Sequence, residues 1–195
     1  MVEYKAMNPD VEVNGQTILS FVDGLGAVKS FAYSILTKNG LQDVDTTGWY
    51  SQQKWLDSFK LIAEKAGPNT LHGIGTKIPE NAQWPPGIES IEAAINSIDI
   101  AYHMNHRLNN KVMFDPDDGS MIEGIGHYGA KKVAEKEIEV VCENPYPCDF
   151  DMGIIQSTAK KFKTDDVKFV DVKHKDPEAC RKKGAKACVY KITWL

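Results

Sequence analysis

The spacing of apolar residues changes along this chain from a helical period to a strand period, and this change constrains the fold more than any other feature. In the segment from Ile91 to Tyr102, apolar side chains recur every three or four positions. Such spacing predicts an amphipathic helix. Further on, Ile138, Val140 and Cys142 alternate with polar residues, which predicts a half-buried strand. The chain therefore combines a helical part with a sheet.

The length and composition favour one compact unit. With 195 residues and 42% hydrophobic content, the chain can bury one sizeable core. We predict a single domain over residues 1–195, with a mainly helical part at 1–110 and a hairpin, helix, hairpin part at 111–195. The fold class is α+β, in which N-terminal helices pack on an antiparallel sheet built from two hairpins with an intervening helix.

The helical part contains three apolar stripes. They predict helices over residues 21–35, with Val28 in the stripe, over 55–66 and over 88–102, and a short helix near 71–77. Aromatic residues in this part form either plain core or the wall of an apolar pocket: Trp49, Tyr50, Trp55 and Phe59.

The second part predicts strands on both sides of a helix. A hairpin is expected within residues 119–142, a helix follows over 148–162, and two further strands lie within 166–174 and 186–194.

Charge and patterning exclude several classes of function. The net charge is −4 and the lysines are scattered among acids, so no nucleic-acid surface is predicted. The start of the chain has no secretory pattern, and no run of about 18 apolar residues occurs, so we expect a cytoplasmic protein without membrane spans. The paired glycines in "GIGTKIPE" and "GLGAVKSF" lack the full phosphate-binding fingerprint.

Four cysteines are the candidates for chemistry. Cys142 and Cys148 flank "ENPYP", and Cys180 and Cys188 flank "RKKGAK". If the two hairpin ends are neighbours, the four sulfurs can converge, and four thiolates complete the tetrahedral shell that zinc prefers. Buried free thiols and a disulfide are the alternatives.

Two other residues near the second pair can donate to a metal. Glu178 offers oxygen and His174 offers nitrogen, and either can replace one thiolate. Both are equally compatible with exposed polar positions before a turn.

The C-terminal segments "YPCDFDMGIIQSTAKKF" and "ACRKKGAKACVYKITW" resemble the vinyl-4-reductase-type ligand-binding domain and its relatives, the H-NOX domains and the TRAPP transport subunits. The resemblance covers residues 119–195, and the helical part only by order and length. It implies a sensor fold with a pocket between the helices and the sheet.

The resemblance also implies a structural zinc site. In phenol-sensing activators that carry this domain, the ligands are a cysteine ahead of the helix, a glutamate, and a Cys-x7-Cys pair in the closing hairpin. Cys148, Cys180 and Cys188 match these positions. Glu178 only approximates the glutamate, so Cys142 is the other candidate for the fourth ligand.

The H-NOX branch adds a haem hypothesis. Its haem is bound by a helix histidine, and His103 is the nearer match by order, ahead of His106. Its Tyr-x-Ser-x-Arg motif is not preserved, because Tyr128 is followed by "GAKK". The loss of the arginine removes the bidentate partner of the haem carboxylates. A helix-end histidine is also compatible with a polar cap.

The predicted function is therefore binding or sensing of a small molecule, hydrophobic or tetrapyrrole-like, with a structural zinc site. One alternative is a haem-binding gas sensor. Another is an enzyme of the vinyl reductase or thiazoline hydrolase type that uses a cysteine, although no catalytic residue can be assigned. Exposed strand edges make a homodimer an expectation as well.

Overall fold

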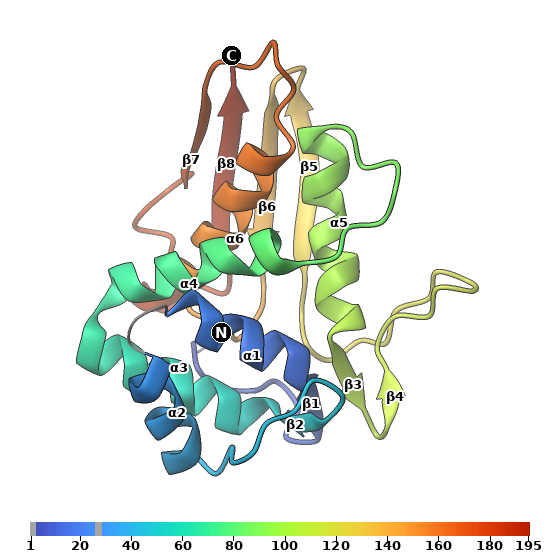
Figure 1. The fold of residues 1–195 in the computed structure, drawn as a ribbon. Coiled ribbons are helices and arrows are strands. Elements are labelled where there is room, and N and C mark those ends of the chain that lie inside the picture. Colours follow the sequence, from blue (N-terminus) through green and yellow to red (C-terminus); the bar gives the residue numbers. More distant parts are fainter. Residues whose placement is uncertain (1–2, 26–28) are drawn as a thin grey trace.

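The computed structural model describes residues 3–25 and 29–195 and shows a helical part beside a tall sheet (Figure 1). The helices are α1 (Gly15–Gly24), α2 (Lys29–Lys38), α3 (Gln52–Ala66), α4 (Pro68–Asn81), α5 (Ile91–Met104) and α6 (Cys148–Lys161). A small sheet contains β1 (Val11–Asn14), β2 (Trp49–Ser51), β3 (His106–Leu108) and β4 (Lys111–Val112). The larger sheet contains β5 (Tyr128–Ala134), β6 (Glu137–Cys142), β7 (Val170–His174) and β8 (Cys188–Trp194).

The α+β class is confirmed, and the larger sheet has the expected form of two hairpins. Its strand order is β5-β6-β8-β7, with antiparallel neighbours throughout. Helices α5 and α6 cover one face (Figure 1). The alternating residues that point to this face, such as Val140 and Tyr190, are fully buried, whereas the other face carries ion pairs such as Lys191 with Glu137. One apolar and one charged face explain the period of two.

The helical part differs from the expectation in three places. The helix predicted over 21–35 is two helices, since α1 ends at Gly24 and α2 begins at Lys29; Val28 lies outside the described residues. The short helix near 71–77 extends to the full length of α4. The small sheet was not predicted, because its strands have only two to four residues and are too short for a period to be recognised.

Helices α4 and α6 cross at two glycines. A Cβ atom at Gly75 would lie 2.2 Å from the carbonyl oxygen of Phe150, and one at Gly153 would lie 2.3 Å from that of His72. No side chain fits at such distances, so glycine is required in both helices. This contact brings α6, and with it Cys148, against the helical part.

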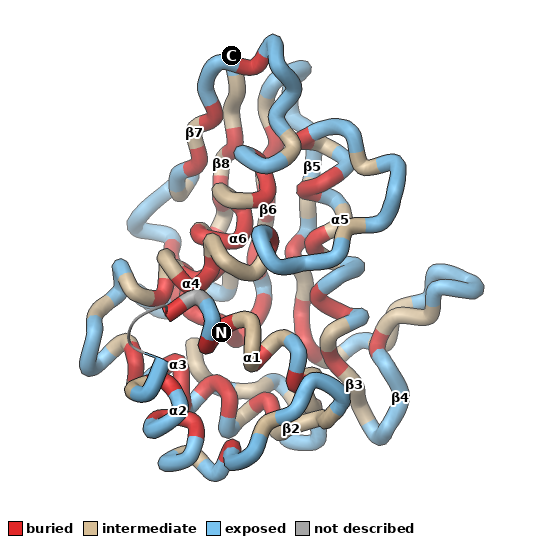
Figure 2. The backbone as a smooth tube through the Cα atoms, in the orientation of Figure 1, coloured by how far each residue is buried: buried red, intermediate tan, exposed pale blue. Residues whose placement is uncertain are grey.

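Buried residues follow the inner faces of α1, α3, α5, α6 and the larger sheet (Figure 2). Phe21, Trp55 and Phe59 pack edge to face, with ring centroids 4.4 to 5.1 Å apart. Trp55 and Phe59 are therefore core residues, and Trp55 also reaches a cavity that is described below. Within the described ranges, no helix is both long and apolar enough to cross a membrane.

Candidate functional site

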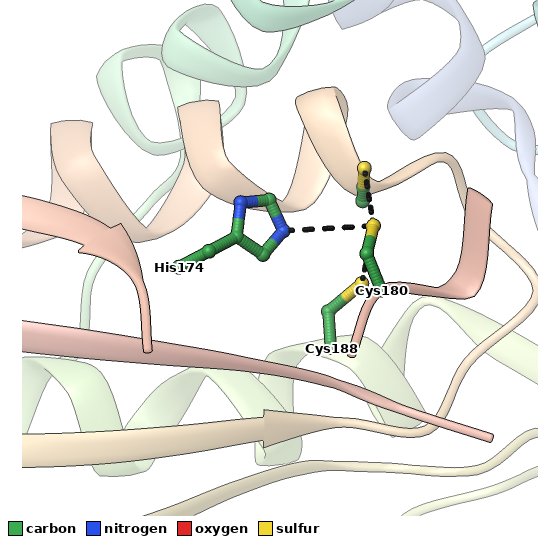
Figure 3. A group of neighbouring side chains, drawn as sticks. His174, Cys180 and Cys188 are labelled. Carbon is green, nitrogen blue, oxygen red and sulfur yellow. Dashed lines mark hydrogen bonds between the residues drawn. The ribbon is translucent and has the colours of Figure 1, made fainter. Parts of the chain in front are cut away.

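Three cysteines and a histidine meet at one end of the larger sheet. Cys148 is the first residue of α6, His174 is the last of β7, and Cys188 is the first of β8, while Cys180 lies in the connection between these two strands. Each of these residues offers one possible ligand atom, and the four atoms lie within 4.8 Å of one another. The imidazole of His174 points at the sulfur of Cys180 (Figure 3). We call these residues the Cys/His cluster.

The chain around the Cys/His cluster is shaped by a tight turn. Residues Arg181–Lys183 form a single 3-10 turn, and Gly184 closes it in the left-handed region at φ 89°. This geometry directs the main-chain N–H of Arg181 to the sulfur of Cys188, at 3.3 Å. On the other side, the hydroxyl of Tyr190 donates to the carbonyl oxygen of Cys148 at 2.6 Å. Both bonds hold the cysteines in register.

The distances within the Cys/His cluster are those of a metal shell. The sulfur of Cys180 lies 3.6 Å from that of Cys148, 3.5 Å from that of Cys188 and 3.9 Å from Nε2 of His174. Tetrahedral zinc with Zn–S bonds of about 2.3 Å places its sulfurs about 3.8 Å apart, whereas a disulfide needs about 2.05 Å. All four cysteines are free thiols. The donor set and its spacing therefore fit zinc.

The thiols of the Cys/His cluster share their protons unequally. The hydrogen bond with Cys148 lowers the pKa of Cys188 far below its usual range, against the effect of burial. The same bond raises the pKa of Cys148, and burial raises that of Cys180. A metal would therefore displace protons from Cys148 and Cys180, whose pKa values are raised.

Two of the sequence-derived candidates lie outside the Cys/His cluster. Cys142 faces Cys188 in the register of β6 and β8, so the hairpin ends are neighbours as expected. However, the cluster lies on the β7 side of β8, and Cys142 lies on the opposite side. Glu178 has a largely exposed side chain and pairs with Lys183 at 2.6 Å. His174 occupies the position that these residues were expected to fill.

Arg181, the residue after Cys180, forms a buried ion pair with Asp151. The guanidinium of Arg181 donates to the carboxylate of Asp151 and to the carbonyl oxygen of Asn144, and both charged side chains are fully buried. Tyr128 donates its hydroxyl to the other carboxylate oxygen of Asp151 at 2.6 Å. Burial raises the pKa of Asp151 to about 6, although the arginine lowers it. Sequence reasoning missed this pair because its members are 30 positions apart.

An apolar cavity of about 120 Å³ lies between the helical part and the sheet. Its wall is built from α1, α3, α4, α5 and α6, from the starts of β3 and β5, and from neighbouring loop residues. Two polar atoms of wall residues are buried without a hydrogen-bond partner: Nε1 of Trp55 and Oγ1 of Thr158. An unpaired buried polar group costs about 1–3 kcal/mol, so these atoms mark where a bound molecule gains most.

The histidine in the cavity wall is His106. Its Nδ1 donates to the carbonyl oxygen of Tyr102 at 2.7 Å, and its Nε2 accepts from the hydroxyl of Tyr146 at 2.8 Å. Burial lowers the pKa of His106 to about 4, so the ring is neutral. His103 is not a wall residue, because it turns to the other side of α5 near His127. The haem hypothesis had named His103 as the ligand.

The second residue of the haem hypothesis, Tyr128, does reach the cavity wall. Its hydroxyl is already bonded to Asp151. The described residues of the wall include no arginine that could pair with a haem carboxylate. The cavity volume is also below the roughly 300–1,000 Å³ typical of sites for ligands of that size. The wall therefore does not fit haem as it stands.

Comparison with known proteins gives structural similarity alone. No family model and no curated protein matches the sequence. Among solved structures, an H-NOX protein from S. oneidensis in the Fe(II)NO state has a TM-score of 0.63 at 12% identity, over 93% of this chain and 99% of that one.

Two further structures agree. A mutant H-NOX of T. tengcongensis gives 0.64 at 16% identity, over 93% and 97% of the two chains. An oxygen-binding H-NOX domain related to soluble guanylate cyclases gives 0.60 at 17%, over 92% of each. The chain has an H-NOX-like fold.

Proposed function

We propose that this chain is a small-molecule-binding sensor domain of the vinyl-4-reductase type, with a structural zinc held by the Cys/His cluster. The observation that carries the proposal is the spacing of the cluster, whose sulfur atoms lie 3.5 to 3.6 Å apart, close to the edges of a zinc tetrahedron. The apolar cavity between the helical part and the sheet supports the second part, which is the binding of a small molecule.

Zinc in the Cys/His cluster would be bound by Cys148, His174, Cys180 and Cys188. With four protein ligands the site is closed, so the ion supplies cross-linking of α6, β7 and β8 and no open position for a substrate. His174 replaces Cys142 in this set. The main-chain N–H of Arg181 would stabilise the thiolate of Cys188 by donating a hydrogen bond to its sulfur.

The cavity supports a ligand of about one aromatic ring. A cavity of about 150 Å³ holds benzene, and this one has a volume of about 120 Å³. Its wall is mainly aliphatic and aromatic, with polar atoms from Trp55, His106 and Thr158. The N–H of Trp55 is a donor without an acceptor. We expect a small apolar molecule that carries at least one hydrogen-bond acceptor.

Metal analysis of cysteine variants tests the zinc site. Protein purified without chelator should contain about one zinc per chain, and Cys180→Ser should lose it. Cys142→Ser is the matched control, since this thiol is equally buried and lies beside Cys188 but outside the cluster. Zinc content that falls equally in both variants would contradict the assignment.

Haem-based gas sensing is a second candidate, favoured by the H-NOX-like fold. When bound, haem would supply an iron that takes a diatomic gas. The cavity would have to enlarge, and His106 would have to give up its bond with Tyr146. The absorption spectrum after haem reconstitution tests this candidate. A Soret band that His106→Gln abolishes would support it, and the absence of a band would eliminate it.

The enzyme hypothesis needs a reactive cysteine. All four thiols are buried, and only Cys188 has a lowered pKa. Its protection by the Cys/His cluster argues for a ligand instead of a nucleophile. A thiol that reacts rapidly in the zinc-loaded protein would restore the enzyme hypothesis.

A further inference from the structure

A second group of possible metal ligands lies between α5 and the start of β5. It contains Asp99, His103 and His127. Each residue offers one possible ligand atom, and the three atoms lie within 4.8 Å of one another. The side chain of His103 is fully buried, that of Asp99 is 19% exposed and that of His127 is 34% exposed. The group is thus anchored inside and open to solvent on one side. We call it the Asp/His group.

The carboxylate of Asp99 stands between the two imidazoles. Its Oδ2 lies 2.9 Å from Nδ1 of His127, and its Oδ1 lies 3.7 Å from Nδ1 of His103. Oδ1 also accepts the main-chain N–H of Tyr128 at 2.9 Å, which fixes the carboxylate between helix and strand. A second carboxylate, that of Glu123, lies 3.0 Å from Nε2 of His127.

One nitrogen in the Asp/His group lacks a partner. Nδ1 of His103 donates to the main-chain oxygen of Asp99 at 2.8 Å, so Nε2 carries the lone pair, and this atom is buried with no hydrogen bond. A histidine whose Nδ1–H is held by a carbonyl and whose Nε2 is free has the state in which imidazole binds metals. Without a ligand, this nitrogen costs about 1–3 kcal/mol.

The charge of the Asp/His group also favours a cation. The carboxylates of Asp99 and Glu123 lie 2.9 and 3.0 Å from the ring nitrogens of His127 and supply negative charge that a divalent ion would compensate.

We propose that Asp99, His103 and His127 form a second metal site for a divalent first-row ion such as Zn²⁺, Ni²⁺ or Co²⁺, with Glu123 bonded to the outer nitrogen of His127 and not to the ion. The donor set of two imidazoles and carboxylate oxygens suits these ions, and it does not suit Ca²⁺ or Mg²⁺, which prefer oxygen alone. Ligands at about 2.0–2.2 Å span at most about 4.4 Å across the ion. Donor atoms within 4.8 Å therefore need to approach by up to about 0.4 Å for opposite ligands of an octahedral ion, and by up to about 1.4 Å for ligands of a tetrahedral ion.

Cobalt titration of the full-length chain that carries one equivalent of zinc, which the three thiolates of the Cys/His cluster take first, tests this site. Zinc should remain in the Cys/His cluster because Co²⁺ binds more weakly than Zn²⁺ to a given set of ligands. Cobalt should then bind in one equivalent and give the weak visible bands of nitrogen and oxygen ligands, without intense sulfur-to-cobalt absorption. Sulfur-to-cobalt absorption would report the Cys/His cluster, so failure of one site is distinguished from failure of the other.

Variants connect the binding to these residues. His127→Gln changes a partly exposed side chain, so the variant should fold, and it should weaken Co²⁺ binding by about tenfold or more. His103→Gln should have the same effect. His72→Gln is the control, because His72 lies on α4, bonds Gln156 and belongs to neither group. Absence of sulfur-free binding, or binding that both His127→Gln and His72→Gln leave unchanged, would overturn the proposal.

Discussion

The buried ion pair between Arg181 and Asp151 gives the sharpest stability prediction. The substitution Arg181→Met keeps the volume of the side chain and leaves the carboxylate of Asp151 buried without its cation. Removal of one partner of a buried pair costs about 3–5 kcal/mol. The hydrogen bond from Tyr128 remains, at 2.6 Å, so we expect unfolding to become easier by an amount in this range at pH 7.

Protonation of Asp151 sets a limit to this cost. In the variant, Asp151 can avoid a buried charge by taking up a proton. For a carboxyl group with an ordinary pKa of 3.8, protonation at pH 7 costs about 4.4 kcal/mol, at about 1.4 kcal/mol per pH unit. Between pH 7 and pH 5 the variant recovers about 2.7 kcal/mol. The wild type gains only about 1.4 kcal/mol over the same range, because Asp151 has a pKa of about 6 in the folded protein and its protonation stabilises the fold only below that pH. The difference between the two should shrink by about 1.3 kcal/mol.

Urea unfolding at both pH values, followed by tryptophan fluorescence at one fixed zinc concentration, measures these differences. Lys182→Met is the matched control, since Lys182 is adjacent in sequence and forms a partly exposed pair with Asp149. Exposed pairs contribute about 0–1 kcal/mol. If Arg181→Met and Lys182→Met lose equal stability at pH 7, the reasoning about the buried pair is refuted.

Three further predictions follow from individual contacts. Gly75→Ala should destabilise the fold by about 1–3 kcal/mol, because its Cβ meets a carbonyl oxygen at 2.2 Å. Gly73→Ala, whose Cβ meets no atom within 4 Å, should stabilise the fold by up to about 1 kcal/mol. Thermal unfolding of both variants checks this contrast. Zinc affinity, measured by competition with a chromophoric chelator, should fall as the pH is lowered, since the raised pKa values of Cys148 and Cys180 mean that binding must displace their protons. His106 is buried, and its pKa in the folded protein is about 4. Its contribution to stability is therefore present above pH 6.5, and about 3 kcal/mol of it is lost as the pH falls to 4. In urea unfolding, His106→Gln should lose about 3 kcal/mol less stability than the wild type over this pH range, and a pH profile equal to that of the wild type would contradict the neutral buried ring.

The elements of the second part were predictable because each has a clear period. Alternation through Ile138, Val140 and Cys142 follows from one buried and one charged face of β6. The Cys-x7-Cys pair was recognised because its members lie in one hairpin. The helices of the first part were located, but their ends were not, since the helical spacing of apolar residues in the sequence continues from α1, which ends at Gly24, to α2, which begins at Lys29.

The membership of the Cys/His cluster was not predictable in full. Which residues meet depends on the order β6-β8-β7, which places His174 beside β8 on the side away from Cys142. The contact between Gly75 and Gly153 and the pair of Arg181 with Asp151 are likewise properties of the packed helix α6. None of these leaves a periodic trace in the sequence, because each joins residues tens of positions apart.

Native mass spectrometry of the full chain, purified from its own source without chelator, tests the zinc site and the ligand cavity together. We expect a mass equal to the chain plus one tightly held zinc plus a small organic molecule that is released on unfolding, and Cys180→Ser should lack the zinc. A folded chain with neither zinc nor ligand would contradict both proposed sites. A chain that carries the mass of haem would replace the proposed function by gas sensing.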